Sequence, residues 1–362
     1  MMKKIGRQVF FLPTDERVKR NGEGAFIRLK DGRIMFAYTE YATSGGDHDW
    51  AQLVAIYSAN EGETWSERRV LMQPRAQDAN IMSVSLLRME NGDLGLFFLR
   101  KTDGLCRLHL ARSADEGDSW YEETVCCDEG YYVVNNDRVV RLQNGNILFP
   151  ANLHVRPDSG YSVQCIFCSE DDGKTWKKLG EPVYHPFPNS TTGLQESGLF
   201  QFSDESLWAW ARTRSGSQFM MYSQDDGATW TTPCGSELFT GPDSPMQVKK
   251  VGAATVAIFN PKPRYCGRIE LETAETGKKL WARTPFVCLV SRDGGRTFPE
   301  GYMLEDDPAN AYCYPAIFAG DDYFLVAYYH SNDSGVCLSS CKLTKVMQAE
   351  LIDGYEVKSC IP

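Results

Sequence analysis

The sequence lacks the features of several function classes. It has no run of clustered Lys and Arg, and 48 acidic residues outnumber 38 basic ones, for a formal net charge of -10. Because nucleic-acid backbones bind to clustered positive charge, no nucleic-acid partner is expected. No apolar run approaches the roughly 18–20 residues of a membrane-spanning helix, so no membrane partner is expected either.

Histidine is scarce and cysteine is scattered. The five histidines and twelve cysteines form no Cys/His ladder at metal-binding spacing, so neither a metal nor a cofactor is expected. The basic start Met1-Met-Lys-Lys4 has no apolar core behind it and is not a signal peptide as it stands. The sequence therefore predicts reduced thiols in the cytoplasm, with a leader already removed from a secreted protein as the open alternative.

A short motif of the form Ser-x-Asp-x-Gly-x-Thr-Trp recurs five times, beginning at Ser58, Ser113, Ser169, Ser223 and Ser291. Asn60 replaces Asp in the first copy, and Phe298 replaces Trp in the last. Each copy follows a β-prone run, which indicates the turn of a hairpin. There the Asp can accept hydrogen bonds from turn amides and the Gly can supply a positive φ. Such turns are strong signals of fold and weak signals of function.

A second hairpin pattern alternates with this motif. An apolar run, a polar turn and another apolar run occupy residues 26–36, 86–96 and 139–148, with weaker copies around Asp204, Gly252 and Asp321. Two hairpins make four strands, the content of one propeller blade. Six such units fill the chain without a linker. The sequence predicts an all-β protein: a six-bladed β-propeller of four-stranded antiparallel blades, one domain over 1–362, with residues 8–12 as a candidate closing strand.

Blade geometry sorts the polar residues onto two ends of the ring. One end carries the turns of both hairpins. The other carries the start of each first strand, the end of each second strand and the loop to the third. The candidate residues at this second end are Arg20, Glu23, Asp47, Asp137, Arg138, Glu196, Arg212, Arg283, Tyr312 and Tyr314, with His48 and His154 as further pocket candidates. Several arginines at one mouth indicate carboxylate recognition, because a guanidinium can hold a carboxylate bidentately.

At these residues the chain resembles the sialidases. Gln195-Glu-Ser-Gly-Leu199, followed by Arg212 sixteen residues after the Glu, is similar to a sialidase hairpin. The resemblance implies that Glu196 is the base and that Arg212 binds the substrate carboxylate. Arg283, eight residues before Ser291, matches a second carboxylate-binding arginine of that family.

Two further matches concern the reacting groups. Tyr314-Pro-Ala-Ile317 opens the last hairpin, where sialidases carry their nucleophilic tyrosine, and Tyr312 is the rival at this place. Gly45-Gly-Asp-His-Asp49 stands where the family has its general acid, which implies Asp47, with Asp49 as its equal. The open alternatives are that Tyr314 is a core aromatic residue and that Asp47 caps its own turn.

The first-blade arginine of the family is missing from its expected position. Counting back from the first hairpin turn places Gly22 there, with Arg20 two residues away as the candidate and Glu23 as an unexpected acid. Asp137 and Arg138 also depart from the glycine-rich entry usual in the third blade. These departures put the identity of the acidic sugar in doubt.

The resemblance implies an exo-α-sialidase-like glycoside hydrolase acting on a terminal sialic or related ulosonic acid. Its carboxylate would be clamped by the arginines, which would also lower the pKa of the tyrosine. The mechanism would retain configuration, with a Tyr nucleophile, a Glu base and an Asp acid. The partner would be an acidic sugar or sialylated glycan. The alternatives are a hydrolase of another acidic glycan, a non-catalytic glycan-binding propeller, and a scaffold that binds protein at its rim.

Overall fold

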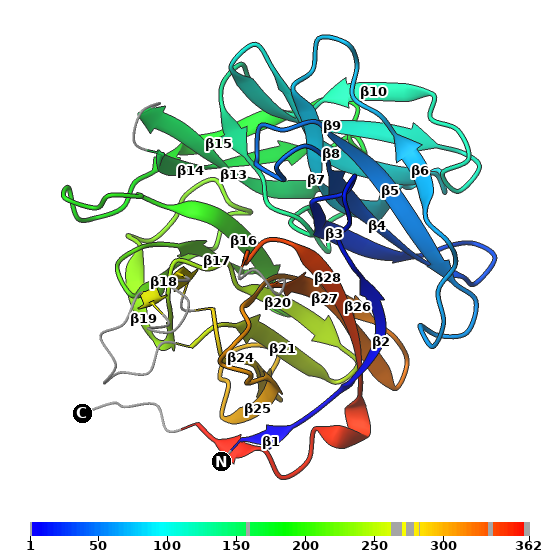
Figure 1. Ribbon diagram of the computed structural model, residues 1–362. Coiled ribbons are helices and arrows are strands. Elements are labelled where there is room, and N and C mark those ends of the chain that lie inside the picture. Colours follow the sequence, from blue (N-terminus) through cyan, green and yellow to red (C-terminus); the bar gives the residue numbers. More distant parts are fainter. Residues whose placement is uncertain are drawn as a thin grey trace.

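Six antiparallel sheets stand side by side around a central axis in the described residues (Figure 1). The computed structural model describes residues 2–156, 160–261, 270–272, 279–281, 283–331 and 336–357. In this part of the chain no helix is long and apolar enough to cross a membrane. The six-bladed β-propeller predicted from the repeats is confirmed.

The strands of each blade are given in order outward from the central axis. In the first three blades this order follows the chain directly. Blade one contains β3 (Arg20–Arg28), β4 (Ile34–Tyr41), β5 (Ala51–Ser58) and β6 (Arg69–Met72). Blade two contains β7 (Asn80–Arg88), β8 (Leu94–Thr102), β9 (Leu105–Ser113) and β10 (Glu122–Val125). Blade three contains β12 (Val140–Arg141), β13 (Ile147–Arg156), β14 (Tyr161–Ser169) and β15 (Lys177–Val183), and β11 (Tyr132–Val133) also pairs with β13.

The last three blades carry the additions to the regular pattern. Blade four contains β16 (Gln195–Gln201), β17 (Leu207–Arg212), β18 (Ser217–Ser223) and β19 (Cys234–Thr240). Blade five contains β20 (Gln247–Val251), β21 (Ala254–Phe259), β24 (Phe286–Ser291) and β25 (Glu300–Glu305). At its edge, β1 (Lys3–Lys4) pairs with β25 in parallel and β29 (Tyr355–Glu356) pairs with β25 antiparallel. The strands β22 (Glu270–Glu272) and β23 (Lys279–Trp281) form a separate pair.

Blade six closes the ring with strands from both ends of the chain. It contains β26 (Tyr312–Ala319), β27 (Tyr323–His330), β28 (Ser340–Met347) and the N-terminal strand β2 (Arg7–Leu12). β2 pairs antiparallel with β28, from Arg7 opposite Lys345 to Leu12 opposite Cys341. The predicted closing role of residues 8–12 is therefore confirmed. A short 3₁₀ helix, Gln348–Glu350, follows β28.

The repeated motif forms the turn that the sequence predicts. In the third copy, Asp171 Oδ1 accepts hydrogen bonds from Ser169 Oγ and from the Thr175 amide, each at 2.8 Å. The Gly173 amide donates to Ser169 Oγ at 2.7 Å, and this glycine has a φ of 85°. Trp176 Nε1 donates to the Gly173 carbonyl at 3.2 Å, which fixes its ring beside the sheet. The motif is thus a self-contained hydrogen-bonded turn.

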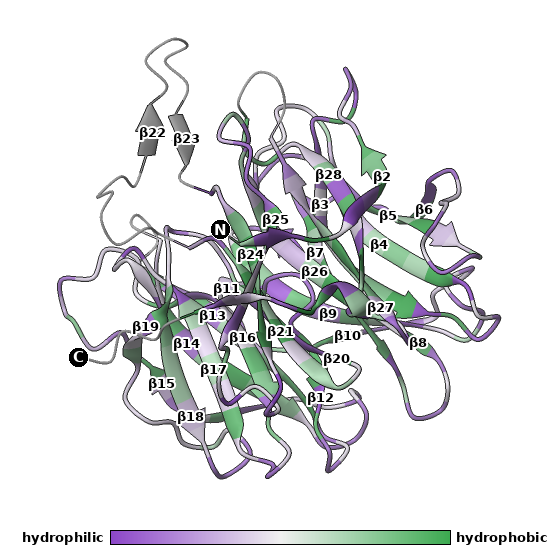
Figure 2. Cartoon of the chain, turned by 90° about the horizontal axis from the view of Figure 1, so that it is seen from below, coloured by the Kyte–Doolittle hydropathy of each residue, from purple (hydrophilic) through white to green (hydrophobic). Residues whose placement is uncertain are grey.

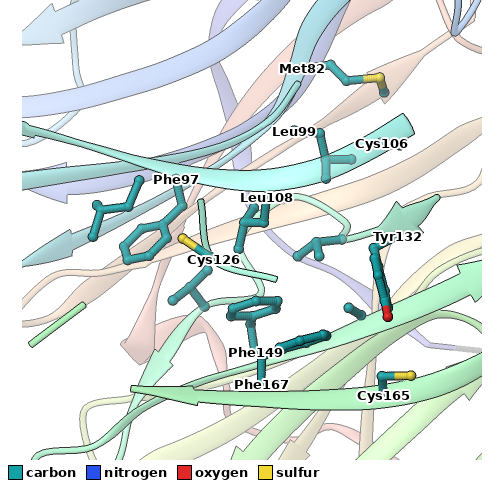
Figure 3. Close-up of a cluster of buried hydrophobic side chains, with 14 of the residues drawn as sticks. Met82, Phe97, Leu99, Cys106, Leu108, Cys126, Tyr132, Phe149, Cys165 and Phe167 are labelled. Atoms are coloured by element: carbon teal, nitrogen blue, oxygen red, sulfur yellow. The ribbon is translucent and has the colours of Figure 1, made fainter. Parts of the chain in front are cut away.

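Hydrophobic residues lie mainly in the strands, and hydrophilic residues concentrate in the loops (Figure 2). Neighbouring blades pack face to face through these side chains. Between blades two and three, Phe97 and Leu108 meet the stacked rings of Phe149 and Phe167, whose centroids lie 5.3 Å apart (Figure 3). Burial of such side chains is worth about 1.5–3 kcal/mol each. This packing makes the ring a rigid support for the residues at its mouth.

Candidate active site

The innermost strands carry an unusual backbone feature at the axis. In five blades a non-glycine residue with positive φ stands within the first four residues of this strand or, for Asp137, three residues before it: Glu23 (55°), Ser83 (59°), Asp137 (57°), Glu196 (45°) and Tyr314 (58°). In four of these blades the ladder to the second strand shifts register there, as a β-bulge does. A bulge re-aims a side chain, and such a φ costs about 1–3 kcal/mol. The feature places polar groups at the mouth of the ring.

Two adjoining cavities open among these residues. The inner cavity has a volume of about 220 Å³ and the outer one about 550 Å³. Both are lined by Asp47, Glu196, Arg212 and Tyr314, so they form one continuous two-lobed site. Three other predicted residues each line one lobe. Glu23 lines the inner lobe, and Arg20 and Arg283 line the outer lobe.

Tyr314 and Glu196 are in direct contact at the centre of this site. Tyr314 donates from its hydroxyl to Glu196 Oε1 at 2.6 Å, and Arg212 Nη1 lies 2.9 Å from Glu196 Oε2. Arg212 Nη1 is also 3.4 Å from the Tyr314 hydroxyl oxygen. The β16–β17 pairing places Gln195 opposite Arg212, so one hairpin delivers both Glu196 and Arg212 to the same rim.

The electrostatics of this pair differ in one respect from the sequence-based expectation. Burial raises the pKa of Glu196 above its usual value, opposed by Arg212 and by the Tyr314 hydrogen bond. Burial and the Glu196 charge also raise the pKa of Tyr314 well above its usual value, and Arg212 and Arg283 offset only part of that rise. The two arginines lower the pKa of Tyr314, as the sequence predicts, but burial outweighs them and the net shift is upward.

Arg20 reaches the site from two residues before the position at which the family pattern has its first-blade arginine. Its Nε donates to the Tyr329 hydroxyl at 2.6 Å, and its Nη2 is paired with Glu23. A Cβ on Gly22 would lie 2.3 Å from the Tyr329 ring. Tyr329 thus fills the space that a side chain at residue 22 would need, which explains the glycine at the expected arginine position.

Asp47 is the third partner of Arg20. Its Oδ1 accepts a hydrogen bond from Arg20 Nη1 at 2.6 Å, and its side chain is 58% exposed in the loop between β4 and β5. Partial burial would raise the pKa of Asp47, but the charge and hydrogen bond of Arg20, aided by Lys101, hold it below its usual value. Asp49, the rival acid, instead caps this loop by accepting from the Gly46 amide at 2.8 Å.

An acid that the sequence did not single out organises the arginines of the outer lobe. Asp243 Oδ1 lies 2.7 Å from Arg212 Nε, and Asp243 Oδ2 lies 2.8 Å from Arg214 Nε. The Asp243 carbonyl accepts from Arg283 Nη2 at 2.9 Å. Since Asp243 precedes β20 as Glu196 begins β16, blade position could have flagged it. No motif marks it.

Three predicted site residues lie outside the two cavities. Tyr312 is 1% exposed and packs between blades five and six, with Phe286 and Tyr328 as neighbours, because it points away from the axis. Its assignment as rival nucleophile and substrate contact is corrected. Asp137 and Arg138 line a different cavity of about 440 Å³ instead.

Asp137 and Arg138 lie outside the two cavities because contacts with other blades hold them elsewhere. Asp137 turns across the axis and binds Lys249 Nζ at 2.8 Å. Arg138 is buried, donates to the Met246 carbonyl at 2.6 Å and lies over the Trp210 ring. Burial lowers the pKa of Arg138 to about 10. Both residues join blades three and five and do not line the candidate active site.

Besides the residues that it shares with the outer lobe, the inner lobe is lined largely by residues of blades two and three and by the β4–β5 loop. His48 and His154 line it, as the sequence suggested, and so does Lys101, which blade geometry places at this end of the ring; Tyr131 also lines it, although no sequence pattern marks it. The Tyr131 ring lies 4.9 Å from the His154 ring, centroid to centroid. Lys101 follows the apolar run of β8, where its position at the end of a second strand was the available signal.

The structure offers no obvious metal site in its described part. No group of three or more His, Cys, Asp or Glu side chains there could hold an ion. Cys165 and Cys168 have a Cys-x-x-Cys spacing, but both lie within β14 as free cysteines. Side chains three apart on a strand point to opposite faces, so these two thiols do not converge.

Comparisons with known proteins agree with this architecture. The family model of the BNR repeat-like domain matches residues 19–328. The chain belongs to this family. No curated protein matches the chain.

Several solved structures share the fold of this BNR repeat-like protein. A Dyadobacter fermentans protein of unknown function has 17% identity and a TM-score of 0.73, covering 94% of this chain and 99% of its own. The leech intramolecular trans-sialidase has 14% identity and a TM-score of 0.72, covering 96% and 70%. The NanB sialidase of Streptococcus pneumoniae has 13% identity and a TM-score of 0.70, covering 96% and 71%. At these identities the likeness establishes the shared fold alone.

Proposed function

We propose that this protein is a glycoside hydrolase that releases a terminal α-linked sialic or related ulosonic acid with retention of configuration. The observation that carries the proposal is the 2.6 Å hydrogen bond from Tyr314 to Glu196 within a cluster of arginines. An anomeric carbon that bears a carboxylate repels a carboxylate nucleophile, whereas a neutral tyrosine paired with a base avoids that repulsion.

The first step transfers two protons, one from Tyr314 and one from Asp47. Tyr314 attacks the anomeric carbon while its hydroxyl proton passes to Glu196 Oε1. Asp47 donates a proton to the departing glycosidic oxygen. In the second step Asp47 takes a proton from water, the water oxygen replaces Tyr314 on the sugar, and Glu196 returns the proton to the tyrosine. Arg212 and Arg283 hold the sugar carboxylate beside Tyr314.

Asp47 must carry a proton to act as the acid, but the ion pair with Arg20 favours its ionised form. A substrate carboxylate that approaches Arg20 competes with Asp47 for that cation. Loss of the ion pair and the added negative charge both favour the protonated form of Asp47. The exposed loop position of Asp47 allows this exchange without disturbing the buried Arg20–Glu23 pair.

One observation favours a second candidate, a hydrolase of another acidic glycan. Arg20 is already engaged by Glu23, Asp47 and Tyr329, so the carboxylate clamp differs from a free three-arginine cluster. Such a clamp suits a sugar whose carboxylate lies closer to Arg212 and Arg283.

Fluorogenic glycosides test the proposal directly. The 4-methylumbelliferyl α-glycosides of N-acetylneuraminic acid and of 2-keto-3-deoxynononic acid are expected to be hydrolysed, and the β-glucuronide is not. Tyr314→Phe should abolish this turnover, and Tyr312→Phe is the matched control because its ring lies outside the cavity. Hydrolysis of the glucuronide alone would select the second candidate. Turnover that survives Tyr314→Phe would exclude the mechanism.

A further inference from the structure

The inner lobe contains a buried cation for which the proposed mechanism has no use. Lys101, at the end of β8, is 5% exposed and lines the 220 Å³ cavity. Its Nζ donates to the backbone carbonyl of Asp47 at 2.6 Å and lies 5.9 Å from the centroid of the Tyr131 ring. Neither contact supplies a full negative charge.

Lys101 has no carboxylate within 4.0 Å among the described residues. The acids of the same lobe are already engaged: Glu23 and Asp47 with Arg20, and Glu196 with Arg212. Burying an ammonium without an ion pair costs several kcal/mol. Buried charges are therefore normally paired, and this one faces a cavity instead of a carboxylate.

We propose that Lys101 and the inner lobe bind a second acidic group of the substrate, a carboxylate or a sulfate ester. This inference rests on the proposed function for the placement of the first carboxylate. That carboxylate is attached to the carbon that Tyr314 attacks and is held by Arg212, which lies 3.4 Å from the Tyr314 hydroxyl, whereas Lys101 stands on blade two at another wall of the lobe. The second acidic group belongs either to the same sugar or to its neighbour in the glycan.

The size and walls of the inner lobe fit such a group. A cavity of about 150 Å³ holds a benzene molecule, so one of about 220 Å³ holds a substituent that ends in an acidic group. Burial and the nearby cations Lys101 and Arg212 lower the pKa of His154, which keeps its ring neutral. The Tyr131 and His154 rings thus form an uncharged wall beside Lys101.

Binding to the Tyr314→Phe variant, which cannot turn ligands over, tests this inference by calorimetry. The probes are 3′-sialyllactose with one carboxylate, an α2,8-linked disialoside with the second acid on the neighbouring sugar, and an 8-O-sulfated sialoside with it on the same sugar. A hydrogen bond to a charged group is worth about 1.5–3 kcal/mol, so one diacid should bind on the order of 10–100-fold more tightly than sialyllactose. Whichever diacid shows the gain identifies the source of the group.

Lys101→Met in the same background should remove that gain, so that it weakens binding of the diacid on the order of 10-fold more than binding of 3′-sialyllactose. Lys250→Met is the matched control, because Lys250 is exposed and lines the separate 440 Å³ cavity. The inference is overturned if neither diacid binds more tightly than sialyllactose, or if the gain survives Lys101→Met. The comparison among ligands needs no Lys101 variant, so it stands even if that variant folds poorly.

Stabilisation of the protein by a simple anion tests this inference independently of the proposed function. In a thermal unfolding series at fixed ionic strength, sulfate should stabilise the wild-type protein and Lys250→Met more than Lys101→Met. If no sialoside binds but this difference is present, the hydrolase proposal fails and the anion subsite stands. If the three proteins respond alike, the Lys101 subsite is refuted whatever the enzyme hydrolyses.

Discussion

Replacement of Arg20 by Met should destabilise the protein, because it leaves the buried Glu23 carboxylate without its ion-pair partner. The side chains of Arg20 and Glu23 are each 2% exposed, whereas Asp47 is 58% exposed and can be solvated. Breaking a buried pair by removing one partner costs about 3–5 kcal/mol. An unfolding entropy of about 2.1 cal/mol/K per residue gives about 0.76 kcal/mol/K for this chain, so Tm should fall by about 4–7 °C.

Urea unfolding and calorimetry of three variants measure this effect. Arg20→Met/Glu23→Gln removes the orphaned charge as well and should recover most of the loss, to within about 1–2 kcal/mol of wild type. Lys4→Met is the surface control, because Lys4 and Asp306 are 60% and 56% exposed, and it should cost less than about 1 kcal/mol. Equal losses in Arg20→Met and the double variant would refute the argument that an unpaired buried Glu23 dominates the cost.

Three further outcomes are expected for the proposed enzyme. Tyr314→Phe should lower kcat by at least about 10²–10⁴, whereas Tyr312→Phe should keep it within about twofold in the same fluorogenic assay. Asp243→Asn should lower kcat/KM on the order of 10–100-fold by loosening Arg212, and a purely structural role would instead lower Tm at unchanged kcat/KM. Burial raises the pKa of Glu196, and bound substrate should raise that of Asp47, so the acidic limb of the kcat profile, which reports the enzyme–substrate complex, should lie above pH 4.5, with activity lost as pH falls and Glu196 gains a proton.

The fold could be predicted because its signals are local and repeated. The Ser-x-Asp-x-Gly-x-Thr-Trp turn satisfies its own hydrogen bonds, as around Asp171, so each copy marks one hairpin independently of its surroundings. Regular spacing then gives the number of blades. The edge strands β1 and β29 of blade five could not be predicted, because two-residue strands carry no periodic pattern.

The candidate site was predictable where strand ends decide which residues meet. The pairing of Gln195 with Arg212 follows from hairpin length alone, and it fixes Glu196 at the same rim. Tyr312 and Tyr314 could not be separated from sequence, because the bulge at Tyr314 changes which side chains face the axis. A sequence pattern does not report such a bulge.

Contacts between blades were the least predictable part of the site. Asp137 binds Lys249, 112 residues away, and Arg20 binds Tyr329, 309 residues away. These pairs depend on how the ring closes and not on any local spacing. The same holds for Asp243, whose role follows from the two arginines that it touches.

Covalent trapping of the nucleophile tests the central claim most directly. A 2,3-difluoro sialic acid should form a slowly hydrolysed glycosyl-enzyme, because fluorine beside the reacting carbon disfavours the positively charged transition state for its breakdown. Peptide mass spectrometry should then find the sugar on Tyr314, with no adduct in Tyr314→Phe. An adduct on Glu23 or Glu196, or hydrolysis of fluorogenic sialosides with Tyr314 never labelled, would contradict the account.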